Sequence, residues 1–89
     1  GGPSPAVGDR MPPRPGMADG LGWSIVLPSE AQSAAVKESA QQGRVPLAVA
    51  VDPDLPHAVL VRPDGHVALT AAPDEAAELP DRLTAWLNR

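Results

Sequence analysis

Residues 59–70 read VLVRPDGHVALT, and this segment decides how the second half of the chain folds. Two runs rich in β-branched residues flank Pro-Asp-Gly, a sequence typical of tight turns. Pro63 presets φ for the first central position of a type I turn, Asp64 suits the second, and Gly65 takes a left-handed conformation. The sequence therefore predicts a β-hairpin with a three-residue loop and a bulge.

The length of this loop fixes the pairing of the two strands. The predicted cross-strand pairs are Arg62–His66, Val61–Val67 and Val59–Leu69. In this register the large apolar residues of both strands collect on one face. A two-residue Asp-Gly loop would instead set Val61 opposite Ala68 and scatter the match. The solvent-facing Arg62–His66 pair makes this histidine part of a hairpin and not of an active site.

Upstream of the hairpin, the pattern predicts strand, helix and strand. Residues 23–27, WSIVL, combine β-branched and aromatic types between Gly22 and Pro28, as short strands do. Residues 45–51, VPLAVAV, are apolar almost throughout, which predicts a strand covered on both faces. With a helix between them, this order implies a right-handed parallel crossover.

The helix between these strands has recognisable ends. Ser29 and Gln32 have the spacing of a capping box, in which two side chains satisfy the first free N–H groups. We expect the helix over residues 30–42, with Gly43 as a left-handed stop. Its apolar face is rich in alanine, so it should lie close to the sheet.

A second helix is expected at the C-terminus. Apolar residues recur there at steps of four, three and one: Leu79, Leu83, Trp86 and Leu87. Pro80 suits a first turn, so the helix should cover residues 79–88, after a turn at 74–78. Trp86 is assigned to the core. Trp23 fits both a core position and an interface anchor.

The first twenty residues differ in composition, with five glycines and five prolines. We expect residues 1–20 to be a Pro/Gly-rich linker or extended arm, ordered only where it lies against the rest, and residues 21–89 to be the folded domain. Met11 and Met17 are, with Trp23, the candidate interface residues. The start Gly-Gly-Pro without Met suits a processed or excised fragment.

Composition excludes several classes of function. The 89 residues are enough for one small domain, and the absence of cysteine removes disulfide, thiolate and dithiol chemistry. The net charge of −4, without a basic run, argues against a nucleic-acid partner. No apolar stretch approaches the roughly 18 residues of a membrane span. We therefore expect a soluble, cytoplasmic protein.

The side chains that could carry chemistry have simpler interpretations. Ser29 has no nearby His or Lys in sequence to activate it, and capping explains it. The metal-ligating types near the hairpin lack the fixed spacing of a zinc or calcium site: His57, His66, Asp52, Asp54 and Asp64. We therefore predict no catalytic, cofactor-binding or metal residue in this chain.

The predicted order, strand-helix-strand followed by a hairpin and a closing helix, is the minimal thioredoxin-like arrangement. This α/β fold has the order β-α-β-β-β-α, with helices packed on a mixed sheet of about four strands. Within it, residues 8–12 (GDRMP), 22–27 (GWSIVL) and 59–68 (VLVRPDGHVA) resemble the C-terminal domain of flavin-dependent aromatic hydroxylases, which act on phenols and aromatic polyketides. Three separate matches in order are more specific than hairpin chemistry alone.

This sequence also departs from the family pattern. The segment before the first strand is shorter than usual, residues 52–56 replace a longer connection, and no aromatic residue follows "HVA". Redox-active thioredoxins carry two cysteines where the first strand meets the first helix, and residues 28–31 here read PSEA. Such folds often carry a cis-proline before a later strand, which makes Pro56 the candidate cis-proline.

The resemblance implies an appendage and not an enzyme. FAD and catalysis would belong to other domains of a parent monooxygenase, since no G-x-G-x-x-G occurs here. This chain would bind no cofactor and pack against flavoprotein catalytic domains, in cis or in trans, with a homodimer as a further option. The alternative is an independent protein-interaction or dimerisation module with a redox-inactive thioredoxin-like fold. A small enzyme lacks support, because cysteine, a paired base and nucleophile, and a cofactor loop are all missing.

Overall fold

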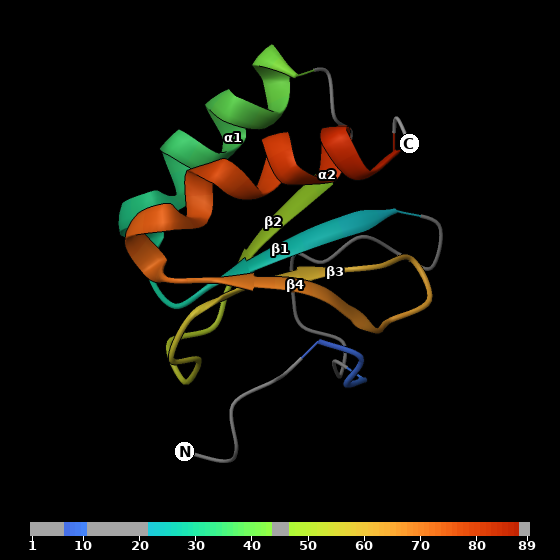
Figure 1. Ribbon diagram of the computed structural model, residues 1–89. Helices are drawn as coiled ribbons and strands as arrows, with labels where there is room; N and C mark the ends of the chain where they lie inside the picture. Colours follow the sequence, from blue (N-terminus) through green and yellow to red (C-terminus); the bar gives the residue numbers. More distant parts are fainter. Residues whose placement is uncertain (1–6, 11–21, 44–46, 88–89) are drawn as a thin grey trace.

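The sheet has four strands, and two helices lie on one of its faces (Figure 1). The computed structural model describes residues 7–10, 22–43 and 47–87. The strands are β1 (Trp23–Leu27), β2 (Leu47–Val51), β3 (Ala58–Val61) and β4 (Val67–Ala71). The helices are α1 (Ser33–Gln42) and α2 (Leu79–Leu87), each preceded by a 3-10 turn, η1 (Glu30–Gln32) and η2 (Pro73–Glu78).

The order of the elements along the chain, the parallel β1–β2 pair and the antiparallel hairpin are as predicted. The strand order is β2-β1-β3-β4, with β1 and β2 parallel and the other two pairs antiparallel. The α/β class, the mixed four-stranded sheet and the two helices agree with a minimal thioredoxin-like fold. The sequence therefore predicted both the elements and their order.

The end of α1 differs from the prediction. Ser29 caps as expected, since its Oγ accepts a hydrogen bond of 3.2 Å from the N–H of Ala31. The Gln32 side chain makes no capping bond within the described residues, so the predicted capping box is only half formed, and the cap begins η1 while α1 starts at Ser33. Gly43 is not left-handed, because its φ is −82°. Its N–H donates to the carbonyl of Ser39 at 3.0 Å, an ordinary α-helical bond. The helix therefore ends without the positive φ that glycine would supply.

Strand β2 is less covered than predicted. Only Ala50 is buried, and the other four residues of β2 are half-buried. The reason is position, because β2 lies at the edge of the sheet and pairs with β1 alone within the described residues. An apolar run indicated burial on both faces, but it carried no information on whether a further strand would cover the edge.

The hairpin turn is confirmed. Arg62 donates its N–H to the carbonyl of His66 at 2.8 Å, and Gly65 donates to the carbonyl of Arg62 at 2.9 Å. Gly65 has a φ of +88°, the left-handed conformation expected there. Val61 pairs with Val67, also as predicted.

Beyond that pair the predicted register is wrong. A bulge between Leu60 and Val61 shifts the pairing, so that Leu60 lies opposite Leu69, and Val59 lies opposite Thr70. The large apolar residues therefore do not collect on one face. Every residue of β3 is buried, because both faces of the sheet are covered.

Two apolar clusters account for this double burial. The helix-side cluster contains, among others, Ile25, Leu27, Val36, Leu60, Leu79 and Leu83. The opposite cluster contains Val26, Ala50, Leu55, Val59, Val61 and Val67. Trp23 is half-buried and packs against the helix-side cluster. The sheet thus has an apolar core on each side. This explains why every residue of the central strands β1 and β3 is buried except Trp23, the first residue of β1.

The candidate cis-proline is wrong. The described residues contain no cis peptide bond, so the bond before Pro56 is trans. The chain turns earlier, where Leu55 donates its N–H to the carbonyl of Asp52 at 3.1 Å and Asp54 donates to Asp52 Oδ1 at 3.0 Å. A trans bond, the default for X-Pro, then leads into β3.

Gly65→Ala is expected to lower the free energy of unfolding by about 1–2 kcal/mol, the cost of forcing a side chain into positive φ. A Cβ at this position would meet no atom within 4 Å, so a clash contributes nothing. Urea denaturation followed by circular dichroism measures the loss. Gly65→Asn should cost less, because asparagine tolerates this conformation. Equal losses for the two variants would contradict a conformational cause.

Candidate interaction surface beside the hairpin

A short segment before the sheet lies along the outer edge of β4. In this entry segment, residues 7–10, Gly8 donates its N–H to the carbonyl of Val67, and Val67 donates back to the carbonyl of Asp9, both at 2.8 Å. Arg10 forms an antiparallel bridge with His66. Part of the first matching motif therefore pairs with part of the last, and the start of β4 has a backbone partner on each side.

An open groove runs beside this contact. Its volume is about 490 Å³, and it lies between the entry segment, the hairpin and α2. The described lining residues are Val7, Gly8, Arg62, Val67, Ala68, Leu69, Arg82 and Ala85. This set, the hairpin groove, is apolar apart from two arginines. Figure 1 shows α2 above β4 and the entry segment below it.

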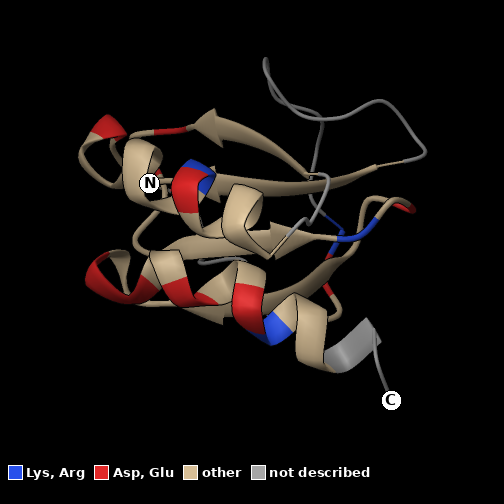
Figure 2. Cartoon of the chain, turned by 90° about the horizontal axis from the view of Figure 1, so that it is seen from above, with Lys and Arg blue, Asp and Glu red and all other residues tan. Residues whose placement is uncertain are grey.

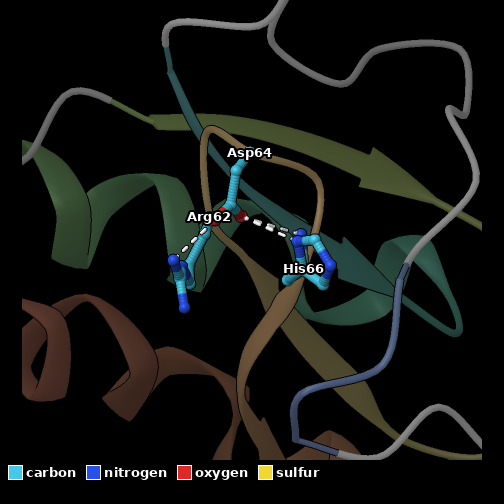
Figure 3. A network of polar contacts seen from close by, with 3 residues as sticks. All are labelled: Arg62, Asp64 and His66. Atoms are coloured by element: carbon cyan, nitrogen blue, oxygen red, sulfur yellow. Dashed lines mark hydrogen bonds and ion pairs between the residues drawn. The ribbon is translucent and has the colours of Figure 1, made fainter.

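The tip of the hairpin holds a small polar network on the rim of the groove (Figure 3). Asp64 accepts at Oδ1 from the backbone N–H of His66 at 3.1 Å, and Arg62 Nη2 lies 2.5 Å from Asp64 Oδ2. His66 Nδ1 is 3.2 Å from Asp64 Oδ1 but lacks hydrogen-bond alignment. All three side chains are substantially exposed. The network therefore fixes the orientation of Arg62 rather than forming a buried charge site.

The backbone N–H of His66 holds the pKa of Asp64 below its ordinary value of 3.8, and the His66 side chain and the Arg62 charge act in the same direction. The ionised form is therefore favoured by folding, so this stabilisation is fully present above pH 3.8 and is lost as the pH falls through the lowered pKa. Asp64→Asn should unfold at lower urea than wild type at pH 7, and the difference should vanish in acid.

Urea midpoints at a series of pH values measure this dependence. The asparagine side chain of the variant can still accept the hydrogen bond from the N–H of His66, so the comparison isolates the charge. A difference between the two proteins that stays constant down to about pH 2, below the usual range of an aspartate pKa, would contradict the assignment.

The structure also locates the other side chains that were considered for chemistry. Ser29 is occupied by its capping bond at the β1–η1 junction. In the described ranges no three His, Cys, Asp or Glu side chains come together as a metal site would require. No helix in those ranges is long and apolar enough to cross a membrane.

The predicted interface residues have different outcomes. Trp23 packs against the helix-side cluster and is half-buried, so its core position is confirmed in part, and its role as an interface anchor stays a prediction. Met11 and Met17 lie outside the described residues, as does the side chain of Trp86. The turn residues Pro63, Asp64 and Gly65 lie where they were expected.

Sequence reasoning missed the residues that line the hairpin groove. Arg82 and Ala85 lie on α2, and Val7 and Gly8 belong to a segment interpreted as a linker. Their proximity depends on packing between elements far apart in sequence. The only sequence signal near these residues was the "GDRMP" motif. That motif did not indicate which part of the fold the segment would contact.

The fold and the cysteine-free junction after β1 define the class, a minimal thioredoxin-like α/β domain without the thiol pair. Residues 4–89 match the family of aromatic-ring hydroxylase C-terminal domains, and the chain belongs to this family. No curated protein and no solved structure matched the chain. The resemblance stated from three motifs is thereby confirmed over nearly the whole length.

Proposed function

We propose that this domain is a non-catalytic, structural part of a flavin-dependent aromatic-ring hydroxylase. The observation that carries the proposal is the family match, which covers residues 4–89 and identifies them as the C-terminal domain of an aromatic-ring hydroxylase. The domain would pack against the flavoprotein's catalytic part and stabilise it. The parent would be a cytoplasmic FAD-dependent monooxygenase.

The β1–η1 junction supports a redox-inactive role. In thioredoxins this junction exposes cysteines at a helix N-terminus, where the helix dipole stabilises a thiolate. Here Ser29 directs its oxygen to the N–H of Ala31, and Pro28 and Glu30 flank it. A capping serine satisfies the helix end, so this position serves the fold.

The sequence and topology also support the absence of a flavin site in this chain. A dinucleotide is usually held by a glycine-rich turn between a strand and a helix. After β1 the chain continues through Pro28 and Ser29, and the next strand, β2, leads to an Asp-Pro-Asp turn. FAD would therefore be bound by the catalytic part of the parent.

A second candidate is an independent interaction or dimerisation module. Strand β2 favours it, because this apolar edge strand pairs on one side only within the described residues. Unpaired strand edges are templates for another chain. Light scattering after gel filtration separates the candidates, since a dimer of the isolated domain would favour the module.

The decisive test of the proposed function is to express the native reading frame that contains these residues, with and without them. We expect the full product to release FAD on denaturation in a stoichiometric amount. The truncated product should keep FAD and unfold at a lower temperature. The isolated domain should bind no FAD and fail to reduce insulin disulfides. A full product without flavin, or loss of FAD on truncation, would count against the proposal.

A further inference from the structure

The hairpin groove carries a net positive charge on an acidic molecule, because among the described residues only one of its two arginines, Arg62, has a carboxylate partner, Asp64 on the rim. The whole chain has eleven acidic and seven basic residues, whereas the described lining contains two arginines and no carboxylate. Figure 2 shows most of the Asp and Glu positions away from the hairpin. A cationic groove on an anionic domain attracts an anionic group and disfavours a cationic one.

The two arginines are held differently. Arg62 is oriented by Asp64, which leaves other N–H donors of its guanidinium group available. Arg82 is exposed on α2 and has no ion pair with any residue of the described ranges. The guanidinium fork matches carboxylate geometry, and a pair formed partly out of water is stronger than an exposed one.

The remaining lining is apolar. Val67, Ala68, Leu69 and Ala85 contribute to it, and Val7 on the rim is 64% exposed. An occupant that covered Val7 would remove apolar surface from water, which favours binding. A peptide segment that fits the groove therefore has apolar side chains against this lining and one carboxylate side chain that reaches Arg82.

The entry segment explains which polypeptide would reach the groove. Val7 forms part of the wall, so a catalytic part that precedes this C-terminal domain in the same polypeptide would be tethered beside the groove. Such a tether gives an effective concentration in the millimolar range, at which a weak contact is occupied. A free partner would need much higher affinity.

We propose that the hairpin groove binds an apolar, carboxylate-bearing segment of the catalytic part of the same polypeptide. This inference rests on the proposed function, since the catalytic part is what that function supplies. Docking there would set the orientation of the domain, because both the entry segment and the groove would then contact the catalytic part. Arg82 forms the central charge contact, and Val7 and Leu69 provide apolar contact.

The test uses the 89-residue chain and a capped probe peptide of alternating leucine and glutamate, Leu-Glu-Leu-Glu-Leu. We expect saturable NMR shifts at the amides of Gly8, Leu69 and Ala85. The matching peptide with glutamine should bind about three- to tenfold more weakly. Arg82→Glu should weaken binding of the glutamate peptide by a similar factor. Lys37→Glu, an equal charge change on α1 outside the groove, should leave it unchanged.

Several outcomes would overturn the groove assignment. These are equal affinities for the two peptides, shifts outside the groove, or equal losses in the Arg82→Glu and Lys37→Glu variants. If the native product carries FAD and the peptide titration fails, the groove proposal alone is wrong. If the native product is not a flavoprotein, the proposed function is wrong. The catalytic part is then also excluded as the occupant of the groove, whether or not the peptide binds.

Discussion

Leu60→Asp is expected to leave the domain largely unfolded at room temperature. Leu60 is 0% exposed, in the middle of the sheet between β1 and β4, and it belongs to the helix-side cluster. The change removes apolar contacts worth about 2–5 kcal/mol and places a carboxylate where it has no partner. Small domains are stable by only about 5–15 kcal/mol in total. Circular dichroism and the dispersion of NMR amide signals measure the folded fraction.

Val7→Asp is the matched control, because it puts the same charge on a side chain that is 64% exposed. Its free energy of unfolding should stay within about 0.5 kcal/mol of wild type. A Leu60→Asp protein that remained folded would contradict the burial of β3 on the helix side.

The register shift shows where sequence reasoning stopped. The turn at Pro63 to Gly65 was predictable because its conformation depends on the φ preferences of those residues alone. The pairing beyond Val61 was not, because Val67 also bonds to Gly8 and Asp9, which lie far earlier in the chain. The sequence of a hairpin does not show that a distant segment will pair with one of its strands. The bulge therefore could not be predicted from residues 59–70.

The errors at β2 and Gly43 have a related cause. Apolar content predicted the strand, but its edge position depends on the order of all four strands. A glycine after a helix predicted positive φ, yet the hydrogen bond to Ser39 closes the last turn in the ordinary way. In both cases the element was predicted and its surroundings were not.

The candidate site was even less accessible to prediction. Family motifs indicated the hairpin and the "GDR" residues separately, and the structure joins them through the Arg10–His66 bridge. In the sequence, Arg82 is only a polar position on an amphipathic helix. The packing of α2 beside β4 makes it part of a groove, because the lining side chains come from three elements.

Leu83→Ala should lower the free energy of unfolding by about 2–5 kcal/mol. Leu83 is 0% exposed and packs in the helix-side cluster with Val36 of α1 and Leu60 of β3. The smaller side chain removes apolar contacts and leaves a cavity that the sheet and α1 fill only in part. Urea denaturation followed by circular dichroism gives the difference from wild type.

Arg82→Ala, one residue earlier on the same helix, is the control for changes in helix propensity. Arg82 is exposed, so this variant should differ from wild type by no more than about 0.5 kcal/mol. If Leu83→Ala were equally mild, α2 would not be anchored on the sheet, and Arg82 and Ala85 would lose the fixed positions that the groove requires. A large loss for Leu83→Ala beside a small one for Arg82→Ala means that the stability of α2 and the charge of the groove can be changed independently.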